Sequence, residues 1–236
     1  MPGLGAVFSS VVLVSCSATI VGAPVRQQGV GMQQVLPTPE QVADAVGNPL
    51  DPAAPPAVGD ITLLPNGIRE SKDVSPLDCL GAVSPLMRVV YEKGDVRGVG
   101  LQDFARYGQG MTVSSVHAGV VRFASDIEAA RMFSSFVSQW RSCADTRVSV
   151  HITENADLQW TVTDVRQTDG ILSATILTGE ADQQSAFPTE HAVGLAADCI
   201  VDVDVAITDV LPSRRVAKTR AADLVAMMLD NINPSR

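Results

Sequence analysis

Histidine is the side chain that most often supplies acid–base chemistry near neutral pH, and this chain has three of them, His117, His151 and His191. The sequence contains no His-Glu-x-x-His helix, no Gly-x-Ser-x-Gly nucleophile motif and no glycine-rich phosphate loop with its lysine. A fold could still gather the three histidines into a metal or catalytic site. Single histidines on alternating strands are more often solvated, however, and we expect that here. We therefore predict no catalytic residue, metal ligand or cofactor.

Acidic and basic side chains form two further candidate groups. Asp202 and Asp204 point to the same side of an expected strand and could form a carboxylate pair, but a strand with one solvated face has the same pattern without any function. Asp198 and Asp202 do not complete a calcium-binding loop. Arg214 and Arg215 precede the last expected helix and could meet an anionic ligand, although a solvated surface turn explains them as well.

The chain has four cysteines, at positions 16, 79, 143 and 199. Their wide spacing and the absence of Cys-x-x-Cys argue against zinc binding and thiol exchange. Apart from Cys16 the count is odd, so at most one intrachain disulfide forms, and three pairings are open. An exported protein would meet the oxidising conditions that a disulfide needs, whereas three buried reduced thiols are the alternative.

Cys16 ends a segment with the features of a bacterial lipoprotein signal. Residues 4–14 are uncharged and mostly small or apolar, a run too short to span a bilayer but suited to a signal peptide. Leu13-Val14-Ser15-Cys16 matches the lipobox pattern, so residues 1–15 are expected to be removed and Cys16 to carry the lipid. No Lys or Arg precedes the apolar run, and we therefore expect a start codon upstream of Met1. The alternative is a buried amino-terminal strand with an ordinary core cysteine.

Composition excludes several classes of partner. The chain has 26 Asp and Glu against 17 Lys and Arg, which argues against a nucleic-acid surface because phosphates require clustered positive charge. The same excess leaves no polybasic patch for anionic lipid head groups. The length of 236 residues is enough for one domain with a flexible segment.

The amino-terminal elements follow from turn and capping residues. Residues 16–36 lack a clear period and are expected to be a tether, and the folded domain is expected over 37–236. Thr38, Pro39 and Gln41 predict the start of a short helix that ends at Asn48-Pro49. Beyond it we expect an extended loop over 51–67, a short helical segment over 78–91 and a glycine-rich turn over 94–100.

The carboxy-terminal two-thirds of the sequence shows alternating strand patterns with helices before, between and after them. Asp169-Gly170 is the strongest hairpin signal, and Cys199, Val201, Val203, Val205 and Ile207 fall on one face of a strand. The expected strands are 113–123, 148–152, 158–162, 171–177 and 199–207, and the expected helices are 125–140 and 218–232. This order predicts an α+β fold with a twisted, mostly antiparallel sheet flanked by helices.

Four segments occur in the order found in one known family. They are Thr38–Gly47 (TPEQVADAVG), Ser75–Ala82 (SPLDCLGA), Gln139–Cys143 (QWRSC) and Asp198–Val203 (DCIVDV). Over roughly residues 36–232 the chain resembles the PknH-like extracellular sensor domain of mycobacteria, which occurs outside a membrane-spanning serine/threonine kinase and in stand-alone lipoproteins.

The resemblance implies a twisted antiparallel sheet with flanking helices and a cleft for an unidentified ligand. Family members typically hold two disulfides, of which the first corresponds to Cys79 with Cys143. The second would join a cysteine shortly after Cys143 to the one at Cys199, but residues 153–160 contain no cysteine, so Cys199 is expected to be an unpaired thiol. No ligand-contacting residue can be transferred from the family.

These observations together predict a lipid-anchored lipoprotein at the outer face of the cell membrane, with a ligand-binding or sensor-type domain and no enzymatic activity. The expected ligand is a small molecule or a lipid held in a cleft, since a sheet roofed by helices can leave such a space. The alternative is a structural lipoprotein that binds a protein partner through its sheet. An envelope hydrolase built on the three histidines is a third hypothesis.

Overall fold

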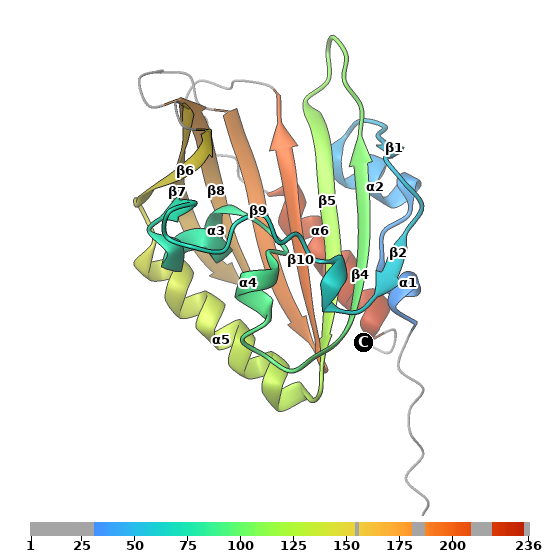
Figure 1. The fold of residues 1–236 in the computed structure, drawn as a ribbon. Helices are drawn as coiled ribbons and strands as arrows, with labels where there is room; N and C mark the ends of the chain where they lie inside the picture. Colours follow the sequence, from blue (N-terminus) through green and yellow to red (C-terminus); the bar gives the residue numbers. More distant parts are fainter. Residues whose placement is uncertain (1–30, 154–155, 181–186, 209–218, 234–236) are drawn as a thin grey trace, which may run out of the picture.

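Ten antiparallel strands form one twisted sheet in the computed structural model, which describes residues 31–153, 156–180, 187–208 and 219–233 (Figure 1). Their order is β1-β4-β5-β10-β9-β8-β7-β6-β3, and β2 also pairs with β4. This confirms the predicted α+β class. The strands are β1 (Asp51–Pro52), β2 (Ala57–Gly59), β3 (Val74–Ser75), β4 (Val96–Ala105), β5 (Val113–Phe123), β6 (Arg147–Thr153), β7 (Ala156–Thr168), β8 (Ile171–Glu180), β9 (Phe187–Ala196) and β10 (Cys199–Ile207).

Two groups of strands meet in the middle of the sheet. β6 to β10 form a meander of consecutive neighbours, and β4 and β5 form a separate hairpin. β10 pairs with β5 along nearly its whole length, from Cys199 opposite Arg122 to Ile207 opposite Val113, and so joins the two groups. Helix α5 (Asp126–Ser142) carries the chain from β5 across the sheet to β6 near the far edge (Figure 1).

Helices cover both faces of the sheet. One face packs against α3 (Leu80–Val83), α4 (Arg88–Tyr91) and α5, and the other against α1 (Met32–Val35), α2 (Pro39–Val46) and α6 (Arg220–Ile232), as Figure 1 shows with α5 in front of the sheet and α6 behind it. The 3-10 turns η1 (Ile61–Leu63) and η2 (Leu77–Cys79) complete the α5 side. None of the described helices is long and apolar enough to cross a bilayer.

Successive side chains along a strand point to opposite faces of the sheet, so the core consists of two apolar clusters, one on each face. Along β10, Ile200 belongs to the cluster under α5, whereas Val201, Val203 and Val205 belong to the cluster under α6. The predicted apolar face of this strand is confirmed. The expectation that its other face is solvated is wrong for Asp202, which is only 2% exposed, because α4 and the preceding loop cover it.

The first long helix begins as its capping residues predict. The Thr38 side chain accepts a hydrogen bond from the Gln41 amide, and the Gln41 side chain accepts one from the Thr38 amide, which completes a capping box. Pro39 occupies the first turn, and Gly47 ends α2 in the left-handed conformation that glycine adopts without strain.

The folded part starts earlier than the sequence suggests. Met32 to Val35 form α1, and Met32, Val35 and Leu36 are all buried against the sheet, so the end of the expected tether belongs to the core. The predicted signal peptide, Cys16 and the rest of the tether lie outside the described residues.

Two other segments differ from the sequence interpretation. The expected loop over 51–67 contains the edge strands β1 and β2, and the expected glycine-rich turn over 94–100 runs directly into the long strand β4. At Gly100 the strand packs closely, since a Cβ atom would lie 3.2 Å from the Val120 side chain. The expected helical segment over 78–91 is divided into η2, α3 and α4.

A disulfide joins Cys79 to Cys143 and confirms the pairing that the family resemblance implies. It ties the start of α3 to the end of α5. Beside it, the buried Trp140 indole of α5 donates a hydrogen bond to the Gly81 carbonyl of α3. A Cβ atom at Gly81 would lie 2.8 Å from Gln139 Oε1, so a larger residue there would require the Gln139 side chain to move. Together these bonds fix the α3–α4 segment onto the sheet.

The predicted hairpin and the predicted last helix are both present. Asp169 and Gly170 form the β7–β8 turn with positive φ angles, as a two-residue hairpin turn requires. Helix α6 buries Leu224, Val225 and Met228 against the sheet. The two elements lie opposite each other across the α6 side of the molecule, and this arrangement leaves a cleft between them.

Candidate functional site

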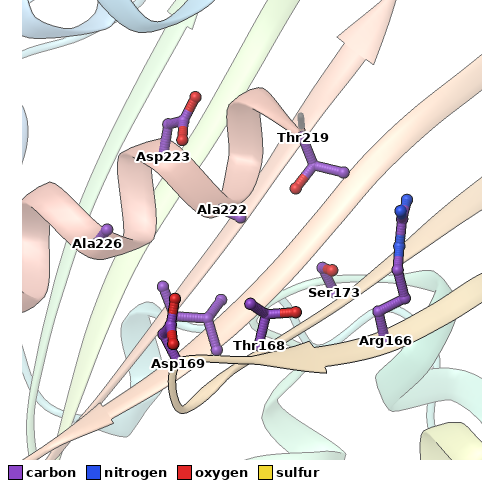
Figure 2. A pocket seen from close by; sticks show the side chains of 9 residues that line it. Arg166, Thr168, Asp169, Ser173, Thr219, Ala222, Asp223 and Ala226 are labelled. Atoms are coloured by element: carbon purple, nitrogen blue, oxygen red, sulfur yellow. The ribbon is translucent and has the colours of Figure 1, made fainter. Parts of the chain in front are cut away.

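A cleft of about 290 Å³ lies between α6 and the β7–β8 hairpin. Its size is at the lower end of the range for small-molecule sites. Its lining combines one cation, two carboxylates and three hydroxyls with a small apolar floor (Figure 2). The lining residues are Arg166, Thr168, Asp169, Ile171, Ser173, Thr219, Ala222, Asp223 and Ala226.

Strand register determines which side chains of the hairpin reach the cleft. Arg166 of β7 is paired with Ser173 of β8, and directly paired residues on neighbouring antiparallel strands project from the same face. Thr168 and Ile171 are likewise paired at the turn. Figure 2 shows the side chains of Arg166, Thr168 and Ser173 rising from the hairpin toward the start of α6.

Two hydroxyls of the cleft are buried and available to a ligand. Ser173 is 8% exposed and Thr219 is 9% exposed. Thr219 is the N-cap residue of α6, yet its side chain does not cap the helix. Within the described part of the chain, neither hydroxyl has a hydrogen-bond partner. Both residues line the cleft, so a polar molecule bound there could form hydrogen bonds with the two hydroxyls.

Glu190 of β9 holds the first turn of α6 in place. Its side chain is 3% exposed, and its carboxylate accepts a hydrogen bond from the Ala221 amide at 3.3 Å and pairs with the Arg220 guanidinium at 3.4 Å. Burial raises the pKa of Glu190, and the Ala221 amide and Arg220 oppose that increase. Because Glu190 pairs with Arg220, the positive charge that is available to a ligand in the cleft is that of Arg166.

Arg166 is exposed, and none of the described residues lies within ion-pair or hydrogen-bond distance of its guanidinium. Arginine presents five donors in a planar fork that suits carboxylate and phosphate groups. Arg166 and the hydroxyls of Ser173 and Thr219 therefore form a donor-rich end of the cleft. The Asp169 carboxylate lies at the hairpin turn, and the Asp223 carboxylate, on the first turn of α6, points away from the hairpin in Figure 2.

A second group of polar residues lies on the opposite face of the sheet, under α3 and α4. The Asp202 carboxylate accepts hydrogen bonds from the Leu86 amide (2.9 Å), the Tyr91 hydroxyl (2.7 Å) and His191 Nε2 (2.8 Å). Burial, together with the Asp202 charge, raises the pKa of Tyr91 well above its usual value and keeps this hydroxyl a donor. Asp202 is therefore satisfied from three separate elements.

His191 is protonated in this arrangement. Its Nδ1 lies 2.9 Å from the Ala82 carbonyl and its Nε2 lies 2.8 Å from Asp202, so both ring nitrogens face acceptors and only the imidazolium can donate to both. Burial alone would lower the pKa of His191, but the Asp202 carboxylate and the Ala82 carbonyl outweigh burial and raise it. The ring also packs against Trp140 with centroids 4.5 Å apart.

The polar row continues across the sheet from His191. Asp204 is opposite His191 on one side and His117 on the other, and His117 is opposite Asp103. The hydrogen bond to Asp103 at 3.0 Å raises the pKa of His117 to about 9, against the effect of desolvation. Burial raises the pKa of Asp204, whose Oδ1 has no partner among the described residues. Carboxylates and imidazoles thus alternate across four strands.

The structure brings some of the sequence candidates together and separates others. His117, His191, Asp202 and Asp204 share this row, whereas His151 lies on β6 near the far edge of the sheet. The expectation that all three histidines are solvated is wrong for His191, which is 1% exposed. No group of histidine, cysteine and acidic residues in the described regions has the arrangement of a metal site.

The remaining sequence candidates are Arg214, Arg215 and Cys199. Arg214 and Arg215 lie outside the described residues. Cys199 is buried and unpaired, as expected, and its thiol donates to Asp198 at 3.3 Å. Burial and the neighbouring Asp198 charge raise the pKa of Cys199 to about 12, so this sulfur stays a protonated thiol at neutral pH.

A larger groove of about 720 Å³ lies near α1, α2 and β1, and it is lined largely by prolines and apolar side chains. Its interior amide, on Gln102, already donates to the carbonyls of Ala54 and Asp103. The groove has no charged side chain in its lining. The cleft under α6 is therefore the better candidate for a specific small-molecule site, since specificity needs convergent polar groups.

Arg166, Ser173 and Thr219 were not candidates in the sequence, because they come from three elements and belong to no motif. A signal did exist for Ser173, which interrupts the apolar strand Ile171–Leu177 at a position that faces α6. Tyr91 and Glu190 were also missed, since their roles depend on which helix covers which strand.

The model of one protein family, the PknH-like extracellular domain, matches residues 28–231. The chain belongs to this family. The crystal structure of the extracellular domain of PknH from Mycobacterium tuberculosis is similar over 88% of this chain and 99% of that one, with a TM-score of 0.71 and 19% identity. That similarity confirms the expected PknH-like fold. No curated protein matches the chain.

A second solved structure, a putative uncharacterized protein from Mycobacterium smegmatis, is similar over 87% of this chain and 97% of its own length. Its TM-score of 0.41 and 16% identity are too low to support any conclusion about function. At such identities the comparisons establish the fold and the family, and the ligand must be inferred from the side chains of this chain.

Proposed function

We propose that this chain is a lipid-anchored lipoprotein of the cell envelope, held at the outer face of the cell membrane through Cys16, whose PknH-like domain binds a small ligand as a sensor-type module. The observation that carries the proposal is the cleft under α6, where the hydroxyls of Ser173 and Thr219 and the guanidinium of Arg166 have no partner among the described residues. Membership of a family named for an extracellular domain supports the location.

Binding rather than catalysis fits the chemistry of the cleft. A serine or threonine nucleophile needs a base within hydrogen-bond distance. In the described residues, neither Ser173 nor Thr219 is hydrogen-bonded to a histidine or carboxylate. His191 is on the opposite face of the sheet, and its ring is bonded to Asp202. A site with donors, acceptors and an apolar floor but no activated nucleophile is suited to recognition.

The lipid anchor is supported by the lipobox pattern that ends at Cys16. Two acyl chains on the cysteine and a third, such as palmitate, on the new amino terminus would satisfy the rule that stable anchoring needs more than one lipid. Intact mass of the protein extracted from membranes tests this directly. We expect a chain that begins at Cys16 with acyl groups, and a Cys16→Ser variant that loses them. An unmodified chain that retains residues before Cys16 would contradict the anchor.

Ligand binding is tested by native mass spectrometry of the full chain after incubation with a small-molecule extract of the bacterial envelope. Ala222→Trp fills the cleft from α6, because Ala222 lines it. Ile127→Trp places the same side chain on α5, where Ile127 is 67% exposed, and is the matched control. We expect a bound small molecule in the native chain and the control, and its loss in Ala222→Trp. Equal retention in both variants would contradict the assignment to this cleft.

A further inference from the structure

We infer that the cleft under α6 recognises a phosphorylated polyol, such as a sugar phosphate or the head group of an inositol lipid, with the phosphate at Arg166, Ser173 and Thr219 and the hydroxyls toward Asp169. The inference rests on the proposed function, since it names the chemical class of the ligand for the same cleft. It goes beyond the family, because it depends on side chains of this chain alone.

The donor-rich end of the cleft fits a phosphate. Arg166 supplies a charged fork, and phosphate oxygens accept two parallel hydrogen bonds from such a fork. Ser173 and Thr219 are residues more than nine-tenths buried that line the same cleft, and their hydroxyls have no partner in the described residues. Figure 2 shows Arg166 and Thr219 at the same end of the cleft, with Ser173 between the hairpin and the helix. Three donors from three elements thus converge on one anionic group.

The ion pair at the start of α6 explains why Arg166, and not Arg220, is assigned to bind the anionic group. Arg220 also lies at the start of α6, but Glu190 pairs with it at 3.4 Å. Glu190 also accepts the hydrogen bond from the first-turn amide of Ala221. The start of the helix is therefore already occupied by a protein carboxylate, and Arg166 is the cation of the cleft lining that has no acidic partner among the described residues.

The other end of the cleft fits hydroxyl groups. The Asp169 carboxylate and the Thr168 hydroxyl at the hairpin turn can accept hydrogen bonds from a polyol. Ile171, Ala222 and Ala226 provide a small apolar surface for the carbon skeleton. A volume of about 290 Å³ suits one small polar molecule better than a lipid tail. The lining therefore favours a compact head group over an acyl chain.

Calorimetric titration of the Cys16→Ser chain tests the inference, because this variant carries no lipid that could itself interact with the probes. The probes are glucose 6-phosphate, inositol 1-phosphate, glucose and inorganic phosphate. Arg166→Gln removes the cation from the cleft, and Arg147→Gln removes the same charge from β6, outside the cleft lining, as the matched control. We expect both sugar-type phosphates to bind, with affinity reduced roughly 10- to 100-fold by Arg166→Gln and unchanged by Arg147→Gln.

Two smaller changes test the buried hydroxyls. Ser173→Ala and Thr219→Val each remove one hydroxyl with little change in volume, and each is expected to weaken binding of glucose 6-phosphate about 5- to 10-fold. Thermal unfolding without a probe shows whether the variants remain folded. Binding of glucose as tight as that of glucose 6-phosphate would overturn the assignment of the anionic end. Binding of inorganic phosphate as tight as that of glucose 6-phosphate would overturn the assignment of the other end of the cleft to a polyol.

The two sources of a phosphorylated polyol are distinguished with vesicles. The Cys16→Ser chain is sedimented with phosphatidylcholine vesicles that contain phosphatidylinositol, and with phosphatidylcholine alone. Sedimentation that requires phosphatidylinositol and is competed by inositol 1-phosphate supports a lipid head group. Binding of the free phosphates without sedimentation supports a soluble ligand, and either result supports the inference.

Failure of the inference differs from failure of the proposed function. If no phosphorylated probe binds but the envelope extract still yields a small molecule that Ala222→Trp excludes, the cleft takes another chemical class and only the inference is wrong. If the extract also yields nothing that depends on Ala222, both are wrong. Equal affinity of Arg166→Gln and Arg147→Gln for glucose 6-phosphate overturns the inference in either case.

Discussion

Removing the Cys79–Cys143 disulfide should lower the free energy of unfolding by about 4 kcal/mol. The two residues are 64 positions apart, and closing a loop of that length in the unfolded chain removes roughly 14 to 15 cal/mol/K of entropy on the chain-entropy model. At room temperature this gives about 4 kcal/mol, a large part of the 5 to 15 kcal/mol typical of a folded domain. Both cysteines are buried, so the Cys79→Ala, Cys143→Ala double variant also loses some packing.

Urea denaturation of the oxidised chain and of the double variant measures this difference, and reduction of the native chain provides an independent comparison. Cys199→Ala is the control, because Cys199 is buried but closes no loop. We expect the double variant to lose far more stability than the control. A loss under about 1 kcal/mol would refute the argument, since it would mean that the loop in the unfolded chain is restricted without the bond.

Three further predictions concern the polar row and a glycine on the α5 side of the sheet. Asp202→Ala should cost roughly 3 to 5 kcal/mol in urea denaturation, because it leaves the His191 imidazolium without its counter-ion. The pKa of His117 is raised from 6.5 to about 9, so the stabilisation by the protonated ring is complete below pH 6.5 and is lost as the pH rises to 9. The difference in unfolding free energy between the native chain and His117→Asn should therefore shrink over that range. Gly119→Ala should cost about 1 to 3 kcal/mol in thermal unfolding, because a Cβ atom would lie 2.6 Å from Leu86.

Sequence patterns predicted the elements whose periodicity is simple. The capping box at Thr38 gave the start of α2, and Asp169-Gly170 gave the β7–β8 turn. Ser125 caps α5, whose buried face includes Phe133, Phe136 and Trp140 as the helical period predicts. In each case the determining interactions are local, between residues a few positions apart, and local chemistry is what a sequence displays directly.

The sequence could not show that both faces of the sheet are covered. A strand with alternating aspartates usually has one solvated face, and Asp202 was interpreted in that way. The structure places the Leu86 amide and the Tyr91 hydroxyl over it, from a segment more than a hundred positions earlier in the chain. Only the Cys79–Cys143 pairing implied by the family suggested that this segment lies against the sheet.

Strand β9 was missed for a related reason. Its residues include Glu190 and His191 in succession, and each is buried on a different face of the sheet. Polar side chains at neighbouring positions break the alternation expected of a half-buried strand, and the sequence alone does not show the partners that make their burial favourable. The same limitation hid the cleft, since Arg166 and Thr219 are brought together only by the packing of α6 on the hairpin.

The disulfide and the His191–Asp202 pair stabilise the same segment, and their contributions should therefore not be additive. The bond at Cys79 holds the start of α3, and the Ala82 carbonyl and Leu86 amide of that segment complete the hydrogen bonds of the ion pair. If the segment detaches when the disulfide is removed, water reaches the pair and Asp202→Ala then costs less than in the oxidised chain. A double-mutant cycle should show a coupling of about 0.5 to 3 kcal/mol, and strict additivity would mean that α3 stays in place without its disulfide.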